Sequence, residues 1–95
     1  MEKPYSFEDI LGSRARVKIL KILAVHNELN ISNIIQKTNL NHSSVSKHLK
    51  ILETMNLIHQ KRFGRIRIYR FKIENLKARS FKKMLEIWEN DSFNT

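Results

Sequence analysis

Apolar residues recur at intervals of three and four along much of the chain, the spacing that places them on one side of an α-helix. The pattern is clearest from Asn41 to Asn56. Asn41 has the side chain of an N-cap residue, and Asn56 can adopt the left-handed conformation that often ends a helix. The apolar residues of this stretch are Val45, Leu49, Leu52 and Met55, with Ile51 at the edge. We therefore predict a helix that is buried on one side.

Two helices are predicted ahead of this stretch, each with a serine as its N-cap. The first is short, lies within residues 1–11 and has Ser6 as its cap. The second runs from Arg14 to about His26 and follows Ser13. Its apolar residues cover too much of the helix surface for a single contact, so we expect this helix to be central in the fold.

A helix-turn-helix is predicted between residues 29 and 56. Leu29 to Ile31 could form a very short strand, and Ser32 is the expected cap of a helix that ends near Thr38. In the turn Asn39-Leu40-Asn41, an asparagine able to adopt the left-handed conformation precedes a buried leucine and the next cap. Two helices joined by such a three-residue turn form this unit.

After Asn56 the apolar period changes from about 3.6 to about 2, which predicts strands. Residues 57–63 and 66–73 read as two strands joined at Gly64, because glycine supplies the positive φ of a tight hairpin. Ile66 and Ile68 lie on one face of the second strand, and the sequence does not indicate what covers them. The expected core-facing residues of that strand are Tyr69, Phe71 and Ile73.

The last predicted helix, from Glu74 to about Asn90, has an apolar side rich in aromatic residues and carries the only Trp of the chain. Such a side can pack against the core of its own subunit or against a helix of a second subunit. Both arrangements are compatible with the pattern alone. Residues 91–95 are expected to fray.

The chain is strongly basic. Its 95 residues carry 18 Lys and Arg against 9 Asp and Glu, a net charge of +9. Such a field favours polyanions, nucleic acid first. The excess is also local, because residues 14–21 hold four cations and residues 61–72 hold six, without an acid in either segment. This clustering indicates a binding surface.

Several other classes of protein are disfavoured. The length suits one small domain, and no apolar run approaches the roughly 20 residues of a membrane span. The chain has no Cys, which removes disulfides and thiolate ligands, and we expect a cytoplasmic protein without a cofactor. The four histidines lack metal-site spacing and the serines lack a Ser-His-Asp arrangement. Neither a metal site nor an enzyme is therefore predicted.

The polar side of the helix from Asn41 to Asn56 has the form of a DNA reader. Small hydrogen-bonding residues are followed by cations, and a major groove about 12 Å wide admits one helix. An ordinary surface helix is the alternative. Three arginines at the hairpin tip favour the interpretation as a DNA-reading helix, because their charges repel one another unless an anion lies nearby. The predicted DNA-binding residues are His42, Ser43, Ser44, Ser46, Lys47, Lys50, Lys61, Arg62, Arg65 and Arg67.

Residues 31–71 resemble the winged helix-turn-helix of ArsR-type bacterial and archaeal transcriptional regulators. The S-x-H-L of Ser46 to Leu49, the L-x-x-x-x-L-I from Leu52 to Ile58 and the G-R-x-x-x-Y of Gly64 to Tyr69 match in order and spacing. Residues 11–23 are similar to the opening of archaeal members. Metal-sensing members use cysteines, or Asp and His ligands on the C-terminal helix. This chain has no Cys and no His after His59, so the resemblance gives no support for metal sensing.

The resemblance implies a mostly helical α+β fold, a winged helix-turn-helix with a two-stranded β-hairpin wing and a C-terminal dimerisation helix. It divides a single domain, 1–95, into an N-terminal helix (1–12), a helical core with the helix-turn-helix (13–56), the wing (57–73) and the dimerisation helix (74–90). His48 matches a family histidine inside the reading helix, and we expect it to be partly buried and hydrogen-bonded to the backbone.

The implied function is that of a sequence-specific transcriptional regulator, a repressor, acting as a homodimer on an inverted-repeat operator in double-stranded DNA. No membrane role is expected, and no small-molecule effector can be named. A non-specific architectural DNA-binding protein and a protein-interaction winged helix module are the alternatives. The predicted dimer interface consists of Phe7, Ile10, Leu11, Phe81, Met84, Leu85 and Trp88.

Overall fold

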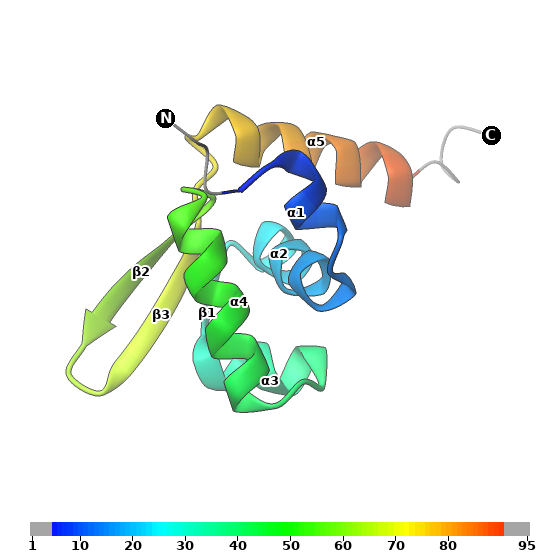
Figure 1. The fold of residues 1–95 in the computed structure, drawn as a ribbon. Helices are drawn as coiled ribbons and strands as arrows, with labels where there is room; N and C mark the ends of the chain where they lie inside the picture. The colour runs from blue at the N-terminus through cyan, green and yellow to red at the C-terminus, as the bar shows by residue number, and fades with distance from the viewer. Residues whose placement is uncertain (1–4, 91–95) are drawn as a thin grey trace.

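The structure, a computed structural model, describes residues 5–90 and contains five helices and three strands in that range (Figure 1). The predicted order of helix, helix, helix, hairpin and helix is confirmed after a short N-terminal helix. Predictions for residues 1–4 and for the fraying of 91–95 lie outside the described residues. The elements are α1 (Phe7–Leu11), α2 (Arg14–His26), β1 (Glu28–Asn30), α3 (Ile31–Thr38), α4 (His42–Thr54), β2 (Ile58–Phe63), β3 (Ile66–Phe71) and α5 (Leu76–Glu89).

The helix-turn-helix is built from asparagines in two backbone conformations. Asn41 caps α4, because its side chain accepts a hydrogen bond from the backbone N–H of Ser44 at 2.7 Å. Asn39 has φ 62° and ends α3 in the left-handed conformation, and Asn56, just after α4, has φ 65°. These three predictions are confirmed.

The predicted cap of α3 is wrong. Asn30, and not Ser32, accepts a hydrogen bond from the backbone N–H of Asn33 at 2.8 Å, so the helix already begins at Ile31. Both residues are of a capping type. Asn30 takes the role because it ends β1 with an extended backbone, whereas Ser32 lies in the first turn.

The wing belongs to a three-stranded antiparallel sheet of order β1-β3-β2. The very short strand expected near Leu29 is observed as β1, and its pairing with β3 was not predicted. Asn30 lies opposite Ile68, whose side chain is half-buried. Ile73 was expected on the core side, but β3 ends at Phe71 and the Ile73 side chain is 41% exposed.

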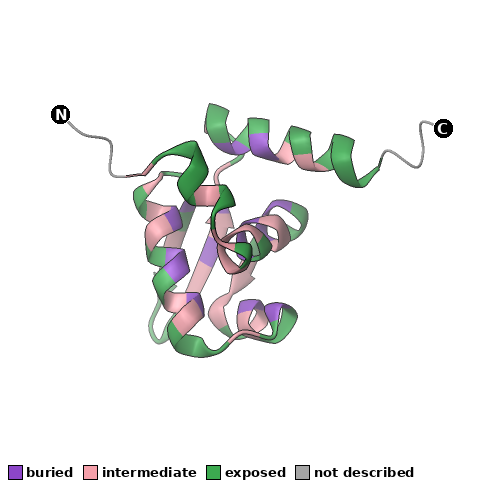
Figure 2. Ribbon diagram, turned by 45° about the vertical axis from the view of Figure 1, so that its right-hand side comes forward, coloured by how far each residue is buried: buried purple, intermediate pink, exposed green. Residues whose placement is uncertain are grey.

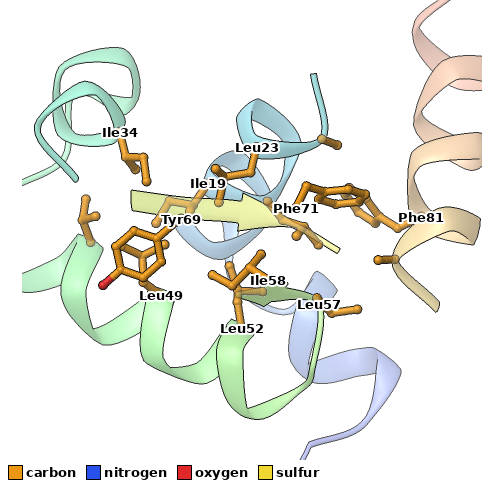
Figure 3. Packing of buried hydrophobic residues seen from close by; sticks show 14 residues of the cluster. Ile19, Leu23, Ile34, Leu49, Leu52, Leu57, Ile58, Tyr69, Phe71 and Phe81 are labelled. Atoms are coloured by element: carbon orange, nitrogen blue, oxygen red, sulfur yellow. The ribbon is translucent and has the colours of Figure 1, made fainter. Parts of the chain in front are cut away.

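Buried side chains from α2, α3, α4, α5 and the sheet converge on β3, where Tyr69 and Phe71 lie at the centre of the cluster (Figure 3). Apolar area removed from water in this way is the main favourable term in folding. The arrangement leaves α4 and the hairpin on the outside of the core. Among the described residues, no helix is long and apolar enough to cross a membrane. The labelled members of the cluster are Ile19, Leu23, Ile34, Leu49, Leu52, Leu57, Ile58, Tyr69, Phe71 and Phe81.

Candidate nucleic-acid interface

One side of α4 is packed and the other is open to solvent. The buried positions, Val45, His48, Leu49 and Leu52, follow the i, i+3, i+4, i+7 spacing of a single helix face. The predicted reading residues occupy the remaining surface. His42, Ser43, Lys47 and Lys50 are exposed, whereas Ser44 and Ser46 are half-buried.

Two residues of this open face contact each other. The Ser46 hydroxyl lies 3.4 Å from Nδ1 of His42, one helical turn away. At that distance the contact is weak, and which atom donates depends on the tautomer of the imidazole. A hydroxyl and an imidazole held side by side offer both a donor and an acceptor to a base edge.

The wing arginines lack acidic partners. Arg62 and Arg65 are exposed and Arg67 is half-buried, and none of the three forms an ion pair with any residue between 5 and 90. Lys61 differs, because its Nζ lies 2.7 Å from Oε1 of Glu28 on β1. Arg62, Arg65 and Arg67 are therefore the cations of the wing that remain available to an external anion.

A tight corner connects α4 to the wing. Two backbone N–H groups donate to carbonyls of α4: that of Asn56 to the Glu53 carbonyl at 2.9 Å, and that of Leu57 to the Leu52 carbonyl at 3.1 Å. Lys72, after β3, donates its Nζ to the Asn56 side chain at 2.6 Å and its backbone N–H to the Leu57 carbonyl. From this corner, α4 and the hairpin both extend toward the end of the molecule where α3 meets α4 (Figure 1).

The family model described as "Bacterial regulatory protein, arsR family" matches residues 13–60, just over half of the chain. The matched segment contains α2, the whole helix-turn-helix and the start of the wing. The chain belongs to the arsR family. It is therefore a DNA-binding transcriptional regulator of the winged helix kind, a fold that is generally not enzymatic.

Solved structures agree with the arsR-family fold. The AntR antimony-specific transcriptional repressor superposes with a TM-score of 0.73 at 16% identity, covering 90% of this chain and 76% of that chain. HlyU from Vibrio cholerae gives 0.70 at 21% identity over 80% and 79%. A homodimeric winged helix-turn-helix domain from Mycobacterium bovis, described as a possible ArsR-family regulator, gives 0.69 at 18% identity over 97% and 94%. No curated protein sequence matches the chain significantly.

His48 of this arsR-family chain lies inside the core side of α4. It is 6% exposed, and its Nδ1 has no hydrogen-bond partner among the described residues, so the predicted backbone hydrogen bond is not observed. Burial lowers the pKa of His48, and the nearby charges of Arg16 and Lys47 lower it further. The imidazole is therefore held in its neutral form, which suits a packing role.

No group of three or more His, Cys, Asp or Glu side chains within residues 5–90 is placed to hold a metal ion. The histidines lie on α2, α4 and β2.

The predicted dimer residues divide into two sets. Phe81 is 9% exposed and belongs to the core, and Ile10 and Leu85 are half-buried against it. The other four residues are exposed, Trp88 most of all at 77%; they are Phe7, Leu11, Met84 and Trp88. The outward side of α5 is accordingly exposed, and its buried positions face the body of the molecule (Figure 2).

Several exposed apolar residues were not singled out from the sequence as surface residues, and four of them lie on α5 and the wing. Leu76 and Ile87 extend the apolar strip of α5, and Phe63 and Ile66 flank the turn of the wing. The exposure of Phe63 could have been inferred from its position beside Gly64 within a basic run. A residue next to a hairpin turn has few neighbours to cover it.

Proposed function

We propose that this arsR-family regulator binds a specific DNA sequence as a homodimer and acts as a repressor. α4 enters the major groove, where His42, Ser43, Ser46 and Lys47 reach base edges and nearby phosphates. Ser44 and Lys50 contact the backbone at the edge of that groove. The observation that carries the proposal is the open face of α4, which presents hydroxyls, an imidazole and cations while the opposite face is buried.

The wing supplies contacts that do not depend on sequence. Arg62, Arg65 and Arg67 lie against the phosphate backbone or the minor groove beside the site of α4, and Lys61 assists at the periphery. Their lack of acidic partners supports this role, because unpaired guanidiniums are matched to phosphate by charge and by planar geometry. If a dimer makes six to ten phosphate contacts, affinity should fall on the order of 10³ to 10⁵ between about 50 and 200 mM salt.

Dimerisation is supported by the exposed strip on α5, formed by Leu76, Met84, Ile87 and Trp88. An exposed apolar strip on a helix is typical of an interface with another helix. In an antiparallel α5 pair about a two-fold axis, Trp88 of one protomer meets the Leu76 end of its partner, and the contact is repeated by symmetry.

A groove beside that end of α5 would accept the indole. The groove has a volume of about 750 Å³ and lies between α1, the end of α4 and the first half of α5. Its lining is mainly apolar and includes Phe7, Ile10, Met55 and Phe81. A two-fold dimer places two copies of α4 on one face, so the operator is an inverted repeat with half-site centres about 34 Å apart.

The test is selection of duplexes from a random pool, followed by competition with random DNA. A regulator prefers its selected site by about 10³ or more over random sequence, and the selected site should be an inverted repeat. A preference near unity would favour the architectural protein. Failure to retard any duplex at low salt would favour a protein-interaction module. Reduced transcription from a promoter that carries the selected site tests the repressor assignment.

A further inference from the structure

Phe63 and Ile66 form an exposed apolar pair at the end of the wing. They are 60% and 55% exposed, and they lie directly opposite each other in the β2–β3 register. Cross-strand partners project on the same side of a sheet. They are also the last pair before the turn, so that two apolar side chains stand side by side at the extremity of the molecule.

The charge around this pair is of one sign. Arg62 and Arg67 form the neighbouring cross-strand pair on the other face, and Arg65 lies in the turn itself. Within residues 5–90, the ion-paired cations of the wing strands are Lys61, with Glu28, and Arg70, with Glu74, and neither belongs to the apolar pair or to the turn. A second copy of this basic chain is therefore a poor occupant, whereas a polyanion with apolar recesses is complementary in both charge and polarity.

The projecting apolar pair, rather than the whole hairpin, is of a size to enter one such recess. A two-stranded ribbon is wider than the roughly 6 Å of a B-DNA minor groove, but apolar side chains that project from its tip can enter the groove. The turn is bare, because Gly64 has φ 60° and a Cβ built on it would meet nothing within 4 Å. Apart from the two chain neighbours of Gly64, no described residue therefore crowds this side of the turn.

We propose that the wing tip is a minor-groove wedge that bends the DNA. Phe63, supported by Ile66, presses against the edge of a base step and partly unstacks it, while the surrounding arginines neutralise the flanking phosphates. Apolar wedges of this kind kink a duplex by about 20° to 90° toward the major groove. The inference rests on the proposed function, because it requires α4 and the wing to bind one duplex.

The wedge gives the protein a second source of sequence preference. Pyrimidine–purine steps unstack more easily than other steps, so a TA or CA step under the wing lowers the deformation energy at positions that α4 does not touch. The kink toward the major groove also brings the flanking DNA toward the side of α4. Base reading by α4 and bending by the wing are thus coupled.

The test uses the full chain and a selected duplex of about 30 base pairs, long enough for two half-sites one helical turn apart. Bending is measured by fluorescence transfer between dyes at the duplex ends, and by circular-permutation electrophoresis of longer fragments that carry the same site. A 2-aminopurine base placed at the step under the wing reports unstacking as increased fluorescence. The wild-type complex should show a bend of at least about 20° per wing and an increased 2-aminopurine signal.

Phe63→Thr should remove most of the bend and of the fluorescence increase, and Ile66→Thr should reduce both, because threonine suits a strand but cannot act as a wedge. Two controls are matched to these variants. Arg67→Gln should weaken binding yet leave the bend of saturated complexes unchanged. Val25→Thr removes an equally exposed apolar residue on α2 and should change neither the bend nor the fluorescence increase.

Four outcomes decide between these possibilities. A straight duplex in the wild-type complex overturns the wedge whatever the variants do. An undiminished bend with Phe63→Thr overturns it as well, and in both cases the regulator remains. If no duplex is bound, the proposed function itself fails. Wild-type bending together with 2-aminopurine unstacking under the wing supports the wedge even if a substitution disturbs the hairpin.

Discussion

Arg62 and Arg67 lie directly opposite each other in the pairing of β2 with β3, and neither forms an ion pair within residues 5–90. Like charges directly opposite each other destabilise a sheet, and favourable cross-strand pairs, which set the scale, contribute about 0.2–1 kcal/mol. The isolated protein therefore carries a small cost at this position. Placing the two guanidiniums opposite each other becomes favourable only when an anion lies beside both of them.

Arg62→Gln should accordingly change stability and DNA binding in opposite directions. Unfolding in urea should show a free energy of unfolding higher by about 0.2–1 kcal/mol, whereas DNA affinity should fall and the salt slope should decrease in magnitude by about 1. Arg79→Gln on α5 is the matched control, since it removes the same charge far from the wing. Equal effects of both substitutions on DNA binding would contradict a specific role for the wing.

Base reading and backbone contact should separate by substitution. Ser43→Ala and Lys47→Ala should change the preference among related sequences by about 1–3 kcal/mol per altered base pair. Arg65→Ala should weaken all sequences by a similar factor, because phosphate contacts carry no sequence information. Titration of each variant against a panel of single-base changes in the selected site measures both effects. A uniform loss in all three variants would mean that α4 does not present the reading face.

Trp88 and Phe81 should have different roles although they share α5. Trp88→Ala should convert the dimer to monomer with little loss of monomer stability, because the side chain is 77% exposed. Phe81→Ala should destabilise the fold by about 3–5 kcal/mol, because it opens a cavity in the core. Truncation before Phe81 should do both. Sedimentation equilibrium and urea unfolding distinguish these outcomes, and an undisturbed dimer in Trp88→Ala would exclude this interface.

The stability of the protein should depend on the ionisation of His48. Its pKa is lowered in the folded state by burial, so the unfolded chain, with an ordinary pKa of 6.5, takes up the proton first. The contribution to stability is therefore fully present above pH 6.5 and is lost as the pH falls through the window below that value. Urea midpoints between about pH 5 and 7.5 should fall more steeply toward acid for wild type than for His48→Gln. Parallel curves would show that His48 does not titrate differently on folding.

Local backbone chemistry was readable from the sequence because few residues can perform it. Asn39 and Asn56 adopt positive φ as predicted, and Gly64 does so at the hairpin turn. The cap of α4 followed from Asn41 alone. The backbone conformation at these positions depends on the residue type itself and needs no distant partner.

Features that depend on distant partners were not readable. The choice of Asn30 over Ser32 as a cap depends on β1, which exists because it pairs with β3. The apolar side of α5 is wide enough for two contacts, and the spacing does not say that Phe81 faces inward while Trp88 faces outward. Exposure of the Phe63 and Ile66 pair likewise follows from where the sheet ends.

The corner at Asn56 holds α4 and the wing in one fixed relative orientation, like the two arms of a bracket. Because the Asn56 and Leu57 amides close onto the last turn of α4, and Lys72 fastens the far strand to the same corner, the angle of the bracket is set before any ligand arrives. The protein therefore presents α4 and the wing at one fixed separation, which suits one spacing between adjacent DNA grooves. A residue that cannot hold φ near 65° at this point would change the angle of the bracket, and both arms would lose their fit together.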